Sequence, residues 1–148
     1  MAVAAFALPA PVGAPIVDAS GDPILIDWAD VVNATKYSVD IEGVATYDLY
    51  DYTDPLNPVL IEEDVTADVQ VSFGTSDRTD GDPISDSDLD IAVADLAAAI
   101  AAQLGIPVED LDSLDDATAK VKALNAGNGK GKQNNPFSDP SAAFSVTF

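Results

Sequence analysis

The chain has 148 residues, 47% of them hydrophobic, which is enough for one domain with a buried core. Its 26 acidic and 6 basic residues give a net charge of −20. So few cations argue against nucleic acid as a partner and against docking on anionic lipid. Without Cys or His, the chain lacks disulfides, thiol nucleophiles and imidazole acid–base chemistry. No apolar run reaches the roughly 18 residues of a membrane span.

Residues 1–8 form an apolar N-terminal arm ahead of a single domain over residues 9–148. Phe6 and Leu8 belong either to a packed terminus or to a strand that pairs with another copy, and both interpretations stay open. The arm lacks the basic residues that begin a signal peptide. We therefore expect an extracellular or cell-surface protein whose leader has been removed, or a virion component made without one.

Alternation of apolar and polar residues predicts short strands through most of the chain. A Pro-punctuated edge strand is expected over residues 9–17. The further expected strands cover, in chain order, residues 24–28, 36–43, 44–52, 59–65, 69–73 and 88–93. The third of them is expected to return beside the second as a hairpin partner. The polar, turn-rich sequence between residues 74 and 87 predicts a loop.

One helix is predicted around residues 95–104, with Gly105 as its C-terminal stop. Its large apolar residues are spaced four apart, at Leu96, Ile100 and Leu104. The same stripe extends backwards, so the helix could also begin near Asp86. Residues 108–116 are expected to form an acidic connector.

Residues 117–124 fit two structures equally well. As a helix, they would follow a capping box formed by Ser113 and Asp116. As a strand, they would turn Val121 and the alternate alanines inward and the lysines outward. Spacing alone leaves both open.

Recurring motifs stand at both ends of the chain. Near the start, a Pro-rich stretch precedes an apolar stretch that ends in Trp, a short turn and a Tyr-x-Val stretch, at Pro9 and Pro11, Ile24, Ile26 and Trp28, Val32 and Ala34, and Tyr37 and Val39. Near the other end stand KVKALN, with Val121, Ala123 and Asn125, and SDPSAAFSVTF. Together these motifs resemble the first three strands, the sixth strand and the closing strand of a fibronectin type III domain. The resemblance covers residues 8–43 and 117–148.

The resemblance implies a mainly β fold: an antiparallel β-sandwich with an inserted helix around residues 95–104. It also favours a strand at 117–124. Such sandwiches run to about 100 residues, so roughly 50 residues are surplus. We expect this surplus in the middle of the chain, with a helical insertion around residues 86–116. The family's corner Tyr is absent, since Ala117 lies near its place.

Closely spaced carboxylates suggest a Ca²⁺ site, the one cofactor that the sequence points to. The candidate ligands are Asp80, Asp82, Asp86, Asp88 and Asp90. They do not form an EF-hand, because Ile91 and Ala97 occupy the positions of its Gly and its last Glu. The alternative is that these residues solvate a loop and cap a helix. Residues 109–116 hold a second acidic cluster.

Two further features point to contacts with a neighbour. Tyr47, Tyr50 and Tyr52 could form a sugar platform, pack on the sandwich, or contact another copy. Residues 1–119 hold 25 acids and 2 basic residues, a net of −23, whereas residues 120–148 hold 4 Lys and 1 Asp, a net of +3. This asymmetry favours a head-to-tail contact that involves Lys130 and Lys132.

These observations predict a non-enzymatic structural subunit, with no catalytic residue singled out. Its copies would assemble into a homopolymer: an extracellular fibre, a surface layer or a virion-type assembly. The alternative is a calcium- or carbohydrate-binding extracellular module.

Overall fold

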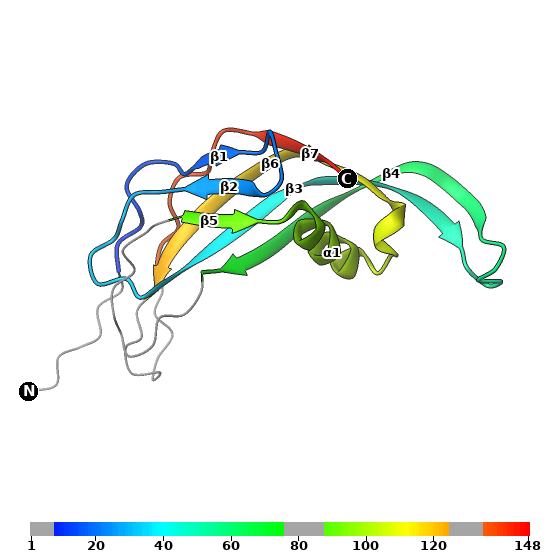
Figure 1. Ribbon diagram of the computed structural model, residues 1–148, viewed down its shortest axis with the longest axis horizontal. Helices are drawn as coiled ribbons and strands as arrows, with labels where there is room; N and C mark the ends of the chain where they lie inside the picture. Colours follow the sequence, from blue (N-terminus) through cyan, green and yellow to red (C-terminus); the bar gives the residue numbers. More distant parts are fainter. Residues whose placement is uncertain (1–7, 76–87, 125–134) are drawn as a thin grey trace, which may run out of the picture.

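The computed structural model describes residues 8–75, 88–124 and 135–148 (Figure 1). It is mainly β, with two antiparallel sheets and one α-helix. The three-stranded sheet has the order β1-β2-β5 and consists of β1 (Ile16–Asp18), β2 (Ile24–Asp27) and β5 (Asp88–Ile91). The four-stranded sheet has the order β4-β3-β6-β7 and consists of β3 (Lys36–Asp51), β4 (Val59–Gly74), β6 (Leu111–Leu124) and β7 (Phe144–Thr147). The predicted mainly β, sandwich-like fold with one helix is confirmed.

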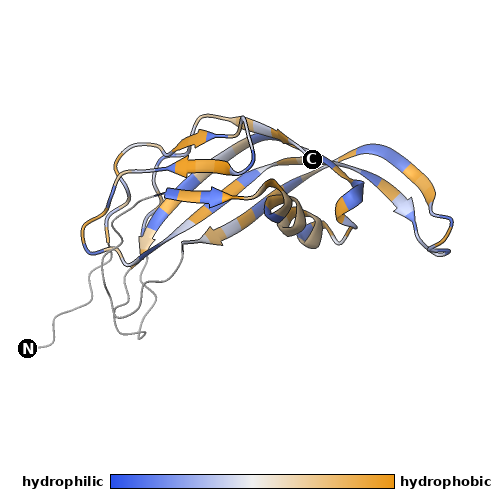
Figure 2. Cartoon of the chain, viewed as in Figure 1, coloured by the Kyte–Doolittle hydropathy of each residue, from blue (hydrophilic) through white to orange (hydrophobic). Residues whose placement is uncertain are grey.

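The core lies between the two sheets, where alternate residues of each strand point inward. Figure 2 shows this alternation as orange and blue steps along the strands. Tyr37 on β3 lies opposite the small Ala123 of β6 and is 1% exposed. Its hydroxyl accepts the Val31 N–H at 2.9 Å, and its ring packs edge-on against Trp28 with 5.1 Å between the ring centroids. The two aromatic residues that support the family resemblance therefore pack together in the core.

The predicted helix is present as α1 (Val93–Leu104), with Leu96 and Ile100 fully buried. The Asp22 carboxylate accepts the Val93 N–H at 3.0 Å, and Gly105 ends the helix at φ 71°. The alternative start near Asp86 is wrong, because the residues just before the helix form β5. They are held extended by pairing with β2.

Residues 117–124 form a strand, as the family resemblance predicted, and the helical alternative is wrong. The strand begins earlier, at Leu111, so the expected connector is only a short 3-10 helix, η2 (Val108–Asp110), followed by the first part of β6. Asp112, Asp115 and Asp116 misled the prediction, since they stand at partly exposed, exposed or irregular positions of a paired strand. Among the described residues no helix is long and apolar enough to cross a membrane.

The closing segment lies along β6 before it forms β7. Ser138 and Ser141 both donate their backbone N–H to β6 and accept an N–H from it with their hydroxyls. Farther back, the Asn135 amide donates to the Ala123 carbonyl and accepts the Leu8 N–H. Leu8 is therefore fixed beside the end of β6, and it is buried in the core.

The main difference from prediction is the length of the central hairpin. β3 and β4 are each 16 residues long, where the sequence suggested several short strands. Residues 44–52 continue β3 instead of returning beside it, because Gly43 lies at an irregular point of a continuous strand and not in a turn. A Cβ on Gly43 would lie 3.0 Å from both the Ala117 Cα and the Asp115 carbonyl oxygen, so a side chain there would require β6 to move by a few tenths of an ångström.

Candidate functional site

The far part of the β3–β4 hairpin leaves the sandwich and projects from it, at the right of Figure 1. Tyr47 is the last β3 residue that pairs with β6, through Leu111, and beyond it β3 pairs only with β4. We call this projection, residues 48–64, the finger. Every residue from Asp51 to Asp64 is exposed. A two-stranded hairpin gains little stability alone in water, so we expect this extension to add little to the stability of the sandwich.

The tip of the finger is an ordered turn. The Asp51 carboxylate accepts hydrogen bonds from the backbone and hydroxyl of Thr53, which lower the pKa of Asp51. The Asp54 carboxylate accepts the Leu56 N–H and the Asn57 side-chain amide, both at 3.1 Å. Asx turns of this kind fix the backbone locally. They hold Leu56, which is 90% exposed, out into solvent.

The finger combines exposed apolar and acidic side chains. Its exposed large apolar residues are Tyr52, Leu56, Val59, Leu60 and Ile61. Its exposed acids are Asp51, Asp54, Glu62, Glu63 and Asp64. A cluster of apolar side chains rimmed by polar ones is typical of a surface that contacts another molecule.

Three carboxylates meet where the finger joins the sandwich. Asp48, Asp64 and Asp112, from β3, β4 and β6, have oxygens within 4.8 Å of one another, and we call them the aspartate triad. Each lies at an irregularity of the sheet: pairing shifts register beside Asp48 and Asp112, and Asp64 has φ 55°. The Asp64 N–H also donates to the Asp48 carboxylate at 3.1 Å. Sequence reasoning placed Asp112 in an acidic cluster but missed its two partners, which are remote along the chain.

Burial and the neighbouring carboxylates control the electrostatics of this junction. Desolvation raises the pKa of Asp112, and the charge of Asp48 and a hydrogen bond with it raise this pKa further. At the end of η2, the Asp110 carboxylate accepts a hydrogen bond from the Tyr52 hydroxyl, which raises the pKa of Tyr52 to about 12. This hydrogen bond ties the finger to η2.

Replacing Asp112 with Asn should stabilise the protein at neutral pH. Because the folded-state pKa of Asp112 is raised, the wild type loses stability as pH rises from the ordinary Asp range through that pKa. The variant avoids this loss, so its melting temperature should be higher than that of the wild type at pH 7, by a few degrees at most because solvent screens this partly exposed group.

Thermal melts between pH 3 and 7 in a chelator would test this, with Asp139→Asn as the control for loss of one exposed charge. The gain should shrink as pH falls towards the ordinary Asp range. A gain that is the same at every pH would contradict the account of Asp112.

The expected site residues are distributed over different parts of the molecule. Asp88 and Asp90 are exposed on β5, opposite Asp27 and Leu25 of β2, and away from the triad. Leu8 is buried. The remaining predicted site residues lie outside the described part of the chain: Phe6, Asp80, Asp82, Asp86, Lys130 and Lys132.

The three tyrosines do not form one platform. Tyr47 is half-buried and packs against the core. Tyr50 and Tyr52 lie on the finger with ring centroids 6.0 Å apart and tilted by 47°. Tyr47 therefore packs on the sandwich. Tyr50 and Tyr52 lie where a neighbouring molecule could reach them.

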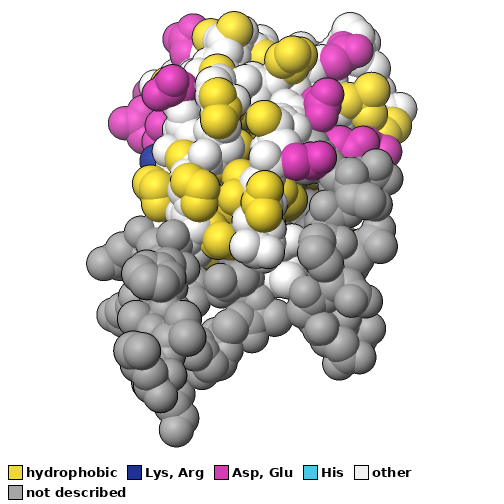
Figure 3. Space-filling view, turned by 90° about the vertical axis from the view of Figure 1, so that its left-hand side faces the viewer, with side chains coloured by type: hydrophobic (Ala, Val, Ile, Leu, Met, Phe, Trp, Pro, Cys, Tyr) yellow, Lys and Arg dark blue, Asp and Glu magenta, His cyan; other side chains and the backbone are white. Residues whose placement is uncertain are grey.

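The end of the molecule opposite the finger also exposes apolar side chains. The segment before β1 and the loop between β2 and β3 lie at this end in Figure 1, and they contain Val12 and Val32, which are 85% and 82% exposed. Figure 3 views this end and shows hydrophobic side chains gathered at its centre, with acidic side chains above them. Lys36, at the start of β3, is exposed as well.

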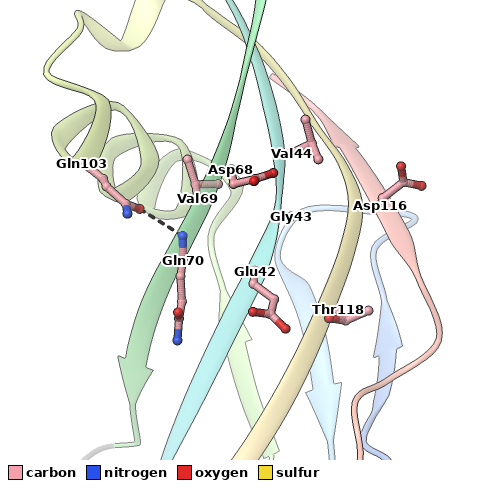
Figure 4. A pocket seen from close by; sticks show the side chains of 9 residues that line it. All are labelled: Glu42, Gly43, Val44, Asp68, Val69, Gln70, Gln103, Asp116 and Thr118. Carbon is pink, nitrogen blue, oxygen red and sulfur yellow. Dashed lines mark hydrogen bonds between the residues drawn. The ribbon is translucent and has the colours of Figure 1, made fainter.

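A shallow open groove of about 540 Å³ lies beside the outward face of the four-stranded sheet (Figure 4). Its polar lining includes Glu42, Asp68, Asp116, Gln70, Gln103 and Thr118. Gln103 of α1 accepts the Gln70 N–H at 3.1 Å, so the helix covers this part of the β4 edge. The lining contains no aromatic residue for stacking on a sugar. The groove is therefore a weaker candidate for binding a ligand than the finger is for contacting another protein.

Comparison with protein-family models, with curated proteins and with solved structures finds no match.

Proposed function

We propose that this protein is a non-enzymatic structural subunit whose copies join head to tail, the finger of one copy contacting the opposite end of the next. The observation that carries this proposal is the ordered finger tip, which holds Leu56 and Ile61 in solvent at 90% and 61% exposure. Neither residue belongs to the hydrophobic core formed by the described residues. Burial against a neighbour would remove their apolar surface from water.

The two ends of the molecule have complementary chemistry. The finger is apolar and acidic, whereas the opposite end exposes Val12, Val32 and Lys36. Different surfaces would meet in such a contact, so each added copy presents a new free finger. Open growth of this kind suits an extracellular fibre, a surface layer or a virion-type assembly.

The apolar N-terminal arm has a role in the same proposal. Leu8 lies beside Asn135 and Ala123, at the end opposite the finger. Seven further residues span about 23 Å when extended. We propose that this arm, with Phe6, adds as a strand to the free edge of β4 on the neighbour's finger.

The family resemblance remains a proposal and is supported by the strand arrangement. The described residues form seven strands in two antiparallel sheets, the strand count of immunoglobulin-like sandwiches, and β4 pairs with β3 in the larger sheet. The packed pair of Trp28 and Tyr37 supports it further. A shared fold would not by itself confer a function.

The alternative function, a calcium- or carbohydrate-binding module, has the aspartate triad as its support. It ranks second because clustered carboxylates also relieve their repulsion by binding a proton, as the raised pKa of Asp112 indicates. Calorimetry with Ca²⁺ separates the two functions: tight binding and a large rise in melting temperature would favour the binding module.

Sedimentation velocity of the wild-type protein at low and high salt, with negative-stain imaging of the same samples, tests the proposed function. We expect polymers with a regular repeat, whose mass grows with protein concentration. A strict monomer at high concentration under both conditions would refute the proposal.

A further inference from the structure

Two lysines and one aromatic ring form a cationic surface on the four-stranded sheet. Lys120 and Lys122 point outward from β6, while the residues between and beside them point into the core. Both ammonium groups lie over the ring of Phe137, at 4.5 and 4.9 Å from its centroid. The ring fixes the two lysines side by side. We call these three residues the lysine patch.

The described carboxylates nearby leave the lysine patch without an ion pair. Asp40 of β3 is directly opposite Lys120. However, its carboxylate accepts hydrogen bonds from Gln70 at 3.0 Å and Ser72 at 2.7 Å, on the other side of the strand. Within the described part of the chain, the two ammonium groups contact the ring of Phe137. Both lysines are half-buried, and together they are two of the six basic residues in a chain of net charge −20.

The finger cannot reach the lysine patch of its own chain. β6 starts beside Tyr47, at the base of the finger, and ends opposite Lys36, at the other end of β3. Between the level of the patch and Leu49, which pairs with Glu62, β3 extends over about 33 Å, at about 3.3 Å per residue. A contact between the two surfaces therefore requires two copies.

We propose that the lysine patch receives the finger of a second copy, with its lysines pairing with finger carboxylates such as Glu62 and Glu63. This inference rests on the proposed function and names the surfaces that meet. Phe137 is half-buried, and we propose that its exposed part gives Ile61 an apolar contact. Exposed ion pairs add more to orientation and encounter rate than to affinity, so the patch selects the register of the contact. Two lysines are too few to hold a nucleic acid against the repulsion of the remaining surface.

A charge-exchange experiment tests this contact. The patch variant has Lys120→Glu and Lys122→Glu, and the finger variant has Glu62→Lys and Glu63→Lys. By sedimentation near 50 mM salt, each variant alone should need at least a tenfold higher concentration than wild type to assemble. A 1:1 mixture should assemble again. The acidic finger of the patch variant can bind the basic patch of the finger variant, and the basic finger of the finger variant can bind the acidic patch of the patch variant. High salt should reduce these differences by screening.

A milder pair of variants controls for folding and net charge. Lys120→Gln with Lys122→Gln and Ser145→Glu with Thr147→Glu on β7 both change the net charge from −20 to −22. Only the first should weaken assembly, by a smaller factor than charge reversal, and thermal melts should show both folded.

The outcomes separate this inference from the proposed function. If the patch variants assemble as wild type does, or if the charge-reversed mixture fails to recover assembly, the lysine patch is not the receiving surface, while assembly itself stands. If the wild-type protein stays monomeric, the proposed function fails and this inference with it.

Discussion

Removing the finger should abolish assembly and leave the sandwich folded. Tyr47 and Val65 are directly opposite each other, so a two-residue Asn-Gly turn can join them in place of residues 48–64. Most of what is removed is exposed, and the core residues nearest the cut keep their neighbours on β6. The melting temperature should therefore change by only a few degrees, whereas polymers should disappear at every concentration.

A point variant distinguishes loss of the apolar tip from loss of the hairpin. Leu56→Asp with Ile61→Asp keeps the finger and should raise the concentration needed for assembly at least tenfold, since burying an unpaired charge is costly. Ile16→Asp, at a residue 72% exposed on β1, is the matched control and should assemble as wild type does. Regular polymers formed by the protein without a finger would contradict the role assigned to it.

Replacing Tyr37 with Ala should have the largest effect on stability. The side chain is 1% exposed, and both its ring contact with Trp28 and its hydrogen bond to the Val31 N–H would be lost. Truncating a buried aromatic residue costs about 3–5 kcal/mol. In a domain of this size the melting temperature should fall by roughly 10 °C.

Tyr37→Phe separates the hydroxyl from the ring and should cost about 1–3 kcal/mol, because the Val31 N–H is left buried without its partner. Tyr50→Ala, on the finger, is the control and should be close to neutral. Urea unfolding followed by circular dichroism measures all three variants. A loss below about 1 kcal/mol for Tyr37→Ala would contradict the packing described for this residue.

The sequence predicted the elements whose periodic pattern coincides with burial. β2, the first part of β3 and α1 follow clear alternation or helical spacing because one face of each is packed. At residues 117–124 the two periods fit equally, and only the resemblance to a known sandwich selected the strand. The spacing of apolar residues in one sequence does not indicate whether the face of a helix or the face of a strand will be buried when both fit.

The finger and the aspartate triad could not be predicted in the same way. Beyond Tyr47 neither strand of the hairpin packs on the core, so no burial pattern marks its length. Asp48, Asp64 and Asp112 come together only through the register of three strands and its shifts. The composition of the finger tip was visible in the sequence, but its exposure was not.

Site-directed cross-linking gives the most direct test of head-to-tail assembly through the finger, because the chain has no cysteine of its own. Leu56→Cys places a thiol at the finger tip, and Asp139→Cys places one at an exposed position close to Phe137. With a short bis-maleimide, the double variant should give a ladder of covalent oligomers on a denaturing gel, and each single variant at most dimers. Only monomers and dimers from the double variant, at concentrations where the wild type forms polymers, would contradict the account.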